Sequence, residues 1–182
     1  MKINEFQIIF IGGIHGVGKS MFSEKISNFL KIPCLSASKL ITEQRKAPAA
    51  VNKRVQSVEE NQNALITAIE LSSIKTRQIF LDGHFCVFDS SDLIRKILLE
   101  TFRMLSPSAV VLLTDEVEHI RQRLENREGR KFSQELLADL QKVELEHASE
   151  VCRVLNIPMC VAEATQHDNA QEFVATRFNN PT

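Results

Sequence analysis

Short apolar runs alternate along the chain with longer segments in which apolar residues recur every three or four positions. The short runs predict β-strands at residues 6–12, 32–35, 78–81, 109–114 and 157–163. The longer segments predict helices at residues 19–31, 51–75, 115–126, 134–156 and 169–178. A further helix is expected to be capped by Asp89–Asp92 and to end near Leu105.

The alternation of these strands and helices predicts an α/β fold. Repeats of this kind form a parallel sheet with helices on both faces, so we expect a three-layer α/β/α arrangement around a five-stranded parallel sheet. The 182 residues suit a single domain that spans residues 1–182. In such sheets ligands bind beside the carboxyl ends of the strands, which are therefore the places to search for chemistry.

Charged side chains nearly balance, with 22 Lys and Arg against 23 Asp and Glu and a net charge of −1. This balance provides no overall field for nucleic acid or for an anionic membrane, so neither is expected as a direct ligand. No apolar stretch approaches the ~20 residues of a membrane helix, and no small-residue cleavage site follows the apolar residues 8–11. These features indicate a globular cytoplasmic protein.

The four cysteines agree with that location. They lie far apart, form no C-x-x-C pair, and have apolar neighbours, which predicts buried thiols in a reducing compartment; they are Cys34, Cys86, Cys152 and Cys160. Zinc ligation is the alternative interpretation, and the spacing gives it little support.

A glycine-rich motif follows the first apolar run. The segment GIHGVGKS, Gly13–Ser20, fits the phosphate-binding P-loop pattern G-x-x-x-x-G-K-[ST] and lies between a predicted strand and a predicted helix. Its glycines let backbone N–H groups converge on an anion at the helix N-terminus. Lys19 is then expected to reach the β- and γ-phosphates of ATP, and Ser20 to bind the Mg²⁺ between them. A glycine turn beside an incidental lysine is the less favoured alternative.

The predicted nucleotide contacts include the residues within and next to this loop. They are Gly13, His15, Gly16, Val17, Gly18, Lys19, Ser20 and Met21. Met21 stands where many such loops carry a second hydroxyl, so only its backbone N–H remains for the α-phosphate. We interpret His15 as a tolerated exposed side chain rather than as a catalytic one.

The third apolar run ends at Asp82, within the sequence IFLDGHF. At the carboxyl end of a strand, Asp82 is placed to hold a water on Mg²⁺ or to accept a hydrogen bond from Ser20. An ordinary Asp-Gly turn is the alternative. Gly83 and His84 are expected to face the same cleft as candidate substrate contacts, although a packed or exposed histidine is an equally reasonable interpretation.

A cluster of arginines follows the fourth predicted strand, in the sequence RQRLENREGRK. Arg123 and Arg127 are four residues apart and share a helix face, and Arg130 lies just beyond them. Arginines that close over a triphosphate stabilise the charge of phosphoryl transfer, so we expect a short lid at about residues 121–132. A solvated charged face, with nearby glutamates as partners, is the alternative.

The size and the arginine lid suit a small kinase, since the chain has no N-K-x-D-like motif of GTPases and no room for the extra subdomain of AAA+ ATPases. Four segments in order resemble those of nucleoside monophosphate kinases, specifically the short-lid, adenylate-kinase-like proteins of archaeal and eukaryotic nuclear type. These segments are GIHGVGKS, LSASKLITEQ, LDGHFCVF and RLENREGRKFSQELLADLQKVELEHASEV. The resemblance spans nearly the whole chain and implies a P-loop NTPase fold, ATP·Mg²⁺ as donor and a nucleotide as acceptor.

The same resemblance implies roles for individual residues. It places Arg123 near the donor base and Arg127 on the phosphates. It also places Ser36 and Ser38 near the acceptor, in or beside a helical acceptor-binding segment at about residues 37–75.

The chain departs from its relatives at the acceptor site. Long-lid adenylate kinases grip the AMP phosphate with arginines at positions where this chain has Ile41 and Cys86. The residues considered as substitutes are Arg45, Lys39 and Lys53. The phosphate donor is therefore better defined by the sequence than the acceptor is.

Two classes of function follow. The first is a phosphotransferase that passes the ATP γ-phosphoryl group to an AMP-like nucleoside monophosphate. A hydroxyl of a nucleoside or small metabolite is also compatible, with Asp82 or His84 as base. The second is an ATP-dependent switch that regulates a protein or ribonucleoprotein partner through slow hydrolysis, which the absent acceptor arginines favour.

Overall fold

The structure, a computed structural model, describes residues 1–46, 58–89, 93–129, 131–164 and 168–179. Three of the residues considered above fall outside this description. They are the side chain of Arg45, Lys53 in the segment between two helices, and Arg130 in the expected lid.

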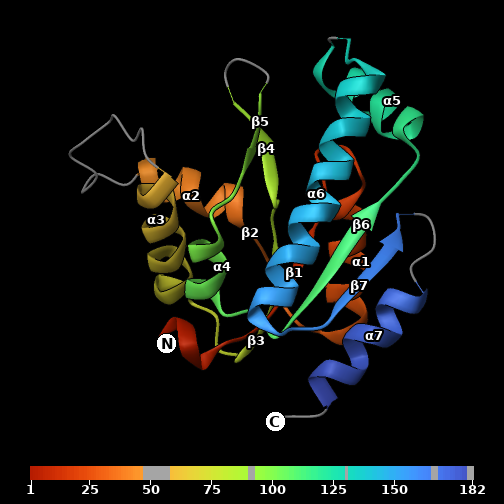
Figure 1. Cartoon of the computed structure of the whole chain (residues 1–182). Coiled ribbons are helices and arrows are strands. Elements are labelled where there is room, and N and C mark those ends of the chain that lie inside the picture. The colour runs from red at the N-terminus through yellow and green to blue at the C-terminus, as the bar shows by residue number, and fades with distance from the viewer. Residues whose placement is uncertain (47–57, 90–92, 130, 165–167, 180–182) are drawn as a thin grey trace.

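A five-stranded sheet forms the centre of the fold (Figure 1). Its strands run parallel in the order β2-β3-β1-β6-β7. Their bounds are Gln7–Gly12 for β1, Cys34–Ser36 for β2, Gln78–Asp82 for β3, Ala109–Thr114 for β6 and Met159–Glu163 for β7. In the register of β1 and β3, Ile11 lies opposite Asp82. The carboxyl ends of these two strands therefore lie side by side, where a ligand is expected.

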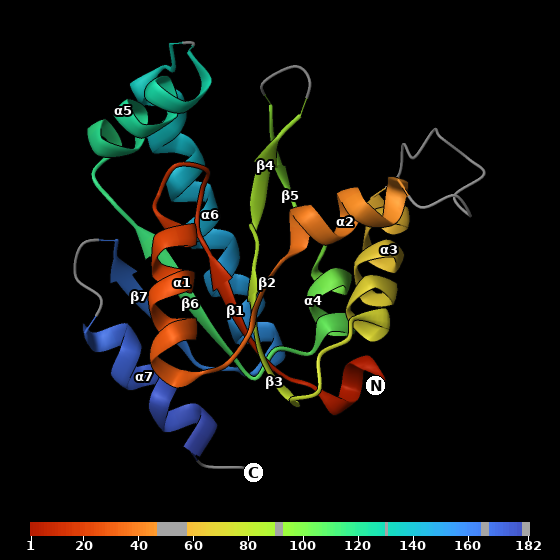
Figure 2. The same ribbon diagram turned by 180° about the vertical axis from the view of Figure 1, so that it is seen from behind.

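Helices cover both faces of the sheet (Figures 1 and 2), after a short 3₁₀ turn at Ile3–Glu5. One face carries α1 (Lys19–Leu30) and α7 (Asp168–Asn179). The other carries α3 (Val58–Leu71), α4 (Leu99–Leu105) and α6 (Gln134–Leu155). Near the carboxyl ends of the strands stand α2 (Ala37–Lys46) and α5 (Val117–Glu128). The predicted α/β class with three layers and a five-stranded parallel sheet is confirmed.

Alternate residues of β1 face two separate cores. Ile9 and Ile11 pack with Phe22 of α1 on one side of the sheet. Ile8 and Phe10 pack on the other side, against α3, α4 and α6. Because both faces of the strand are buried, its sequence is a continuous apolar run rather than an alternating one.

The predicted helix cap at Asp89–Asp92 is wrong. The chain forms an antiparallel hairpin of β4 (Cys86–Phe88) and β5 (Ile94–Lys96) instead, and α4 begins only at Leu99. The Asp89 carboxylate accepts the Leu93 N–H at 3.1 Å and Nε of Arg95 at 2.7 Å, while residues 90–92 lie outside the described part. Asp and Ser are favoured both in turns and at helix caps. The pairing of β4 with β5 selects the turn here.

Several other predicted boundaries shift by a few residues. The helix expected at residues 51–75 is described from Val58 and ends at Leu71, and β7 begins at Met159. The helix expected at residues 115–126 is α5, which runs on to Glu128 and ends at Gly129, whose φ of 68 lies in the left-handed region.

The four cysteines are free thiols. Cys86 and Cys152 are buried as expected, whereas Cys34 and Cys160 are half-buried. Burial raises the pKa of Cys86 to about 12 and the pKa of Cys152 to about 11, so both thiols stay protonated. In the described parts of the chain, no three His, Cys, Asp or Glu side chains gather as a metal-binding group.

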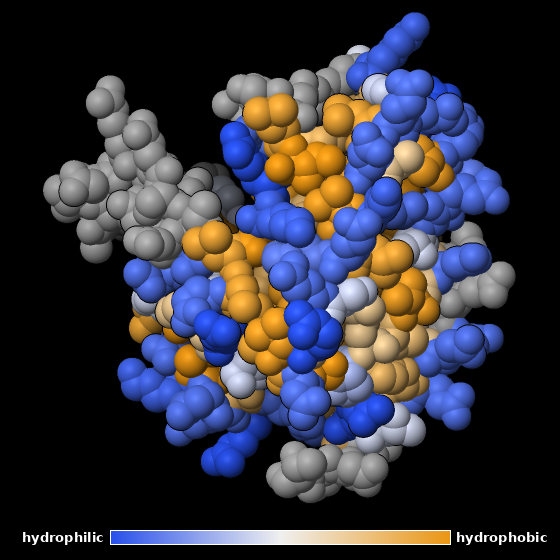
Figure 3. Space-filling model, viewed as in Figure 1, coloured by the Kyte–Doolittle hydropathy of each residue, from blue (hydrophilic) through white to orange (hydrophobic). Residues whose placement is uncertain are grey.

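The surface mixes hydrophilic and apolar side chains. Figure 3 shows apolar areas interleaved with hydrophilic ones over the face that α6 covers. Leu145 and Val154 of α6 and Val161 of β7 are among the exposed large apolar residues. Apolar residues scattered in this way are normal on protein surfaces. None of the described helices combines the length and the apolar character that a membrane crossing needs.

Phe80 is expected to contribute strongly to stability. Its ring is fully buried in β3 and meets the ring of Phe178 edge-on, with the centroids 5.4 Å apart. Phe80→Ala leaves a cavity, so the free energy of unfolding measured with urea should fall by about 3–5 kcal/mol. Phe29→Ala is the matched control, because Phe29 is 66% exposed and its loss should change stability little. Equal losses in the two variants would contradict this account of the core.

Candidate functional site

The P-loop joins the end of β1 to the start of α1. Because α1 begins at Lys19, directly after Gly18, the first N–H groups of the helix open toward the loop. Gly16 and Gly18 have φ values of 80 and 109, which favour glycine. A Cβ at Gly16 would also lie 2.7 Å from Cγ of Leu124 in α5. The shape of the loop and its packing against α5 therefore both require glycine at this position.

A cavity of about 620 Å³ opens beside the loop and brings most of the predicted site residues together. It is lined by His15, Gly16, Gly18, Lys19, Ser20, Met21, Ser36, Ser38, Lys39, Asp82, His84, Arg123 and Arg127. Gly13 and Val17 are buried within the loop. Gly83 lines a neighbouring pocket instead. We call this space the P-loop cavity.

Lys19 is a buried cation at this cavity, with 7% of its surface exposed. Its Nζ donates to the carbonyl oxygens of Gly13 at 2.5 Å and Ile14 at 3.0 Å, and it lies 3.0 Å from Nε2 of His84. Burial lowers the pKa of Lys19 to about 8, although the charge of Asp82 opposes the shift. The ammonium is thus bonded to neutral groups that phosphate oxygens can replace.

His84 stands between Lys19 and His15. Burial lowers the pKa of His84 well below its ordinary value, and the charge of Lys19 adds to this effect. A neutral imidazole can accept the Lys19 hydrogen bond through Nε2. The His15 ring lies against His84 with the centroids 4.1 Å apart, and burial lowers the pKa of His15 to about 4. His15 is exposed, as expected, but its ring also contacts a neighbour in the cavity, which the sequence did not indicate.

Asp82 ends β3 at the edge of the same cavity. Its Oδ1 is buried and has no hydrogen-bond partner among the described residues. Burial raises the pKa of this carboxyl, whereas Lys19 and Lys39 oppose that shift. A buried carboxylate oxygen without a partner fits a role toward hydrated Mg²⁺, and the exposed Ser20 lines the same space. The two residues expected to hold Mg²⁺ thus face one cavity.

Arg123 and Arg127 reach the cavity from α5 but have different partners. Arg123 donates to two carbonyl oxygens of the P-loop at 2.9 and 3.1 Å and pairs with Asp115. Arg127 pairs with the adjacent Glu128 at 2.7 Å and keeps 56% of its side chain exposed. Arg123 therefore stabilises the conformation of the P-loop, whereas Arg127 can reorient toward a bound phosphate group.

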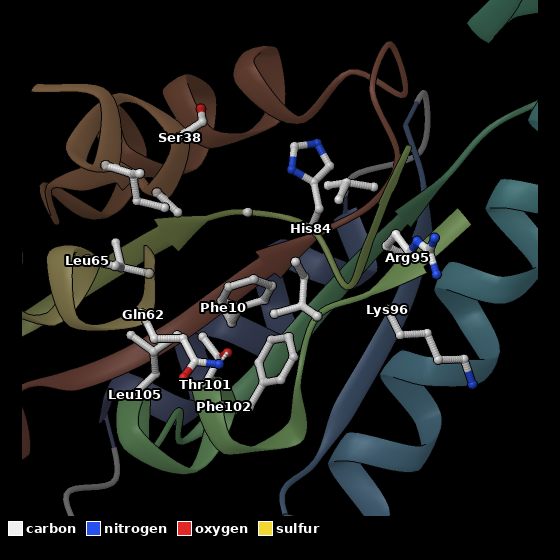
Figure 4. Close-up of a pocket in the computed structure, with 15 residues that line it drawn as sticks. Phe10, Ser38, Gln62, Leu65, His84, Arg95, Lys96, Thr101, Phe102 and Leu105 are labelled. Carbon is white, nitrogen blue, oxygen red and sulfur yellow. Dashed lines mark hydrogen bonds between the residues drawn. The ribbon is translucent and has the colours of Figure 1, made fainter. Parts of the chain in front are cut away.

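A second pocket of about 290 Å³ adjoins the P-loop cavity (Figure 4). Ser38 and His84 line both spaces and mark the junction between them. The pocket lies among α2, α3, α4 and the β4–β5 hairpin. Its apolar lining consists of Phe10, Ala37, Ile41, Leu65, Val87, Ile97, Phe102 and Leu105. We call this space the apolar pocket.

A polar pair lies at the end of the apolar pocket away from His84 (Figure 4). Gln62 of α3 and Thr101 of α4 are 6% and 7% exposed, and Nε2 of Gln62 donates to Oγ1 of Thr101 at 2.5 Å. After this bond the Gln62 amide still carries a second N–H and a carbonyl oxygen. A ring that enters beside Phe10 and Phe102 would meet apolar walls and one polar edge.

Glu144 is a buried residue of the site that the motifs did not reveal. It stands on α6 with 2% of its surface exposed, and its carboxylate accepts the N–H groups of Gly13, Phe85 and Cys86. Burial raises the pKa of Glu144, and these hydrogen bonds oppose that shift. A carboxylate at such a position needs donors from elsewhere in the fold. One feature of the sequence indicates that Glu144 is buried. It lies on the helix face that also carries Leu137, Leu140, Ala148 and Val151.

The sequence of this chain matches the model of a known protein family. The model of AAA_17, described as an AAA domain, matches residues 12–141, from the end of β1 into α6. The chain belongs to this family of P-loop NTPases. AAA_17 includes small proteins similar to nucleoside monophosphate kinases, and the matched residues contain the P-loop, Asp82 and the arginines of α5. The match thus supports nucleotide binding at the P-loop cavity.

Solved structures share the fold of this AAA_17 chain. An uncharacterized protein from Eubacterium ventriosum is 14% identical with a TM-score of 0.50, and the alignment covers 94% of this chain and 97% of that one. TT1252 from Thermus thermophilus is 15% identical with a TM-score of 0.53, covering 97% of this chain and 99% of that one. Likeness at this level of identity concerns the fold alone. Among curated proteins, no sequence matches the chain.

Arg123→Ala is expected to weaken nucleotide binding through the shape of the P-loop. The change removes charged hydrogen bonds to the loop, so Kd for Mg²⁺·ATP measured by calorimetry should rise about tenfold. Arg121→Ala is the matched control, because Arg121 lies on the same helix but pairs at 2.7 Å with both Glu118 and Glu125. A similar rise for both variants would show that Arg123 acts only through general effects on α5.

Proposed function

We propose that the chain is an ATP-dependent phosphotransferase that passes the γ-phosphoryl group to an acceptor in the apolar pocket. The observation that carries this proposal is the junction at Ser38 and His84, where the two spaces meet. A donor in the P-loop cavity and an acceptor in the apolar pocket would present their reacting atoms there. Such positioning supplies much of the catalysis of phosphoryl transfer. An AMP-like nucleoside monophosphate is the first candidate acceptor, as the family resemblance implies.

Residues of the P-loop cavity hold the donor in this proposal. Backbone N–H groups of the loop bind the phosphates, and Lys19 moves from His84 to the β- and γ-phosphates. Ser20 and Asp82 hold Mg²⁺, directly or through its water. When bound, the ion offsets the negative charge of the phosphate oxygens.

The arginines act from α5 and the expected lid at about residues 121–132. Arg127 approaches the transferring group and stabilises its charge, together with Arg130, which lies outside the described residues. Arg123 keeps the loop in shape and lies near the donor base. Transfer then occurs in line from donor to acceptor, without a covalent intermediate on the protein.

A hydroxyl of a nucleoside or small metabolite is the second candidate acceptor. Besides apolar residues, Arg95 and Lys96 line the pocket, and they already pair with Asp89 at 2.7 Å and Glu150 at 3.8 Å. In Figure 4 the amino group of Lys96 is directed away from the pocket. An uncharged acceptor can lie wholly within these surroundings, whereas a nucleoside monophosphate would keep its phosphate at the junction, toward the P-loop cavity. Asp82 or the neutral ring of His84 would then take the hydroxyl proton.

The products formed from Mg²⁺·ATP test the proposal. The protein is incubated with nucleosides, the matching 5′-monophosphates and hydroxylated metabolites, and ADP and phosphorylated products are measured by mass spectrometry. We expect one acceptor class to raise ADP release well above the rate with water alone. Lys19→Ala should abolish this activity, whereas Lys25→Ala, at an exposed position of the same helix, should retain it. If no acceptor raises ADP release, transfer is excluded and the alternative, an ATPase switch acting on a protein or ribonucleoprotein partner, gains support.

Arg127→Ala is expected to separate transfer from ATP binding. Because Arg127 acts on charge that develops during transfer, its loss should lower the transfer rate by about 100-fold or more, while Kd for Mg²⁺·ATP changes less than about tenfold. Arg103→Ala, which breaks a surface pair with Glu100, serves as control in both assays. Equal losses in rate and affinity would mean that Arg127 is a ligand contact only.

A further inference from the structure

The buried carboxylate of Glu144 joins two segments that are distant in the sequence. Its Oε1 accepts the Gly13 N–H at 3.0 Å and the Phe85 N–H at 2.9 Å, and its Oε2 accepts the Cys86 N–H at 2.5 Å. The carboxylate thus bridges the first residue of the P-loop and the chain that follows Asp82 at the end of β3.

The ionised form of Glu144 matches this arrangement. A carboxylate only accepts hydrogen bonds, and N–H groups point at both of its oxygens. Burying one charge is costly unless such bonds compensate for it. A buried charge at a junction of two segments, bonded to both, indicates a specific task that an apolar side chain of similar size would not perform.

The two bridged segments belong to the two sides of the site. Gly13 donates its N–H to Glu144 and accepts Lys19 Nζ on its carbonyl oxygen. Phe85 and Cys86 directly follow His84, whose Nε2 lies 3.0 Å from Lys19 Nζ. Glu144 and Lys19 therefore connect the same two segments, one through a carboxylate and the other through an ammonium group.

Helix α6 also holds the wall of the apolar pocket. The Phe85 carbonyl oxygen accepts the Ile97 N–H at 2.8 Å, and the Ile97 carbonyl oxygen accepts Nε2 of His147 at 2.7 Å. Ile97 lines the pocket, and His147 follows Glu144 by one helical turn. The Phe85 segment is thus hydrogen-bonded directly to a residue that lines the apolar pocket.

We propose that Glu144 is a positioning residue that couples occupation of the P-loop to the geometry of the apolar pocket. This inference rests on the proposed function, in which phosphates take Lys19 away from Gly13 and His84. When the ammonium leaves, Glu144 still accepts hydrogen bonds from both the loop and the Phe85 segment, so both segments move together around the bound nucleotide. Binding of the donor nucleotide in this way sets the geometry of the apolar pocket for the acceptor.

Amide hydrogen exchange tests this coupling. Exchange is followed by mass spectrometry with and without Mg²⁺ and an ATP analogue that has an imido group in place of the β–γ bridging oxygen. In the unmodified protein, the analogue should slow exchange at residues 12–20 and also at residues 83–88. In Glu144→Gln the slowing at residues 12–20 should persist, and most of the response at residues 83–88 should be lost. The glutamine has one acceptor oxygen, and its NH₂ group would face an N–H of the bridged segment.

Matched variants separate coupling from general loosening. Glu146→Gln changes an exposed carboxylate on the same helix and should leave both responses intact. Glu144→Asp keeps the charge but is one methylene shorter, so it should lose part of the response at residues 83–88. If the glutamine variant does not fold, the aspartate variant tests the proposal instead. A response at residues 83–88 as large as in the unmodified protein would then overturn the proposal.

The outcomes distinguish this inference from the proposed function. A response at residues 83–88 that is equally large in Glu144→Gln overturns the coupling role of Glu144. Protection at residues 12–20 of the unmodified protein without any change at residues 83–88 also overturns it, and leaves nucleotide binding intact. No protection at residues 12–20 would reject nucleotide binding itself, and with it both the proposed function and the coupling.

Discussion

The buried ammonium of Lys19 is the interaction on which the rest of the site depends. Carbonyl oxygens of Gly13 and Ile14 and the neutral ring of His84 satisfy its N–H groups. These partners carry no full charge, so they compensate only partly for the loss of water around the cation. Phosphate oxygens accept hydrogen bonds from the ammonium group and also carry negative charge. The loop is therefore preorganised for a polyphosphate, and its neighbours must adjust when Lys19 changes partners.

The position and shape of the P-loop were predictable from the sequence because their determinants are local. The shape of the P-loop depends on the φ values of Gly16 and Gly18 and on a helix that begins at Lys19, all within a few consecutive residues. Asp82 was identified because an apolar run marks a strand and its last residue marks the carboxyl end. The parallel register then places Asp82 opposite Ile11, just before the loop.

The contacts of Glu144 and the lining of the apolar pocket were not predictable in the same way, because they join residues that are far apart in the chain. Glu144 bonds to Gly13 across 131 positions, and Gln62 bonds to Thr101 across 39. A sequence pattern shows at most that a polar residue lies on an apolar face; it does not show the partner. The β4–β5 hairpin was missed for a related reason, since Asp89 and the serines after it suit a turn and a helix cap equally well.

This difference explains why membership in a P-loop family says more about the donor than about the acceptor. A loop that binds phosphate through backbone N–H groups tolerates many changes in the side chains around it. The fold itself is shared with structures that are only 14–15% identical. The apolar pocket is built from side chains of β1, α2, α3, α4 and the hairpin, and each substitution there changes what fits. In the proposed function, the acceptor is therefore determined by this chain's own lining, including Phe10, Gln62 and Phe102, rather than by the family fold.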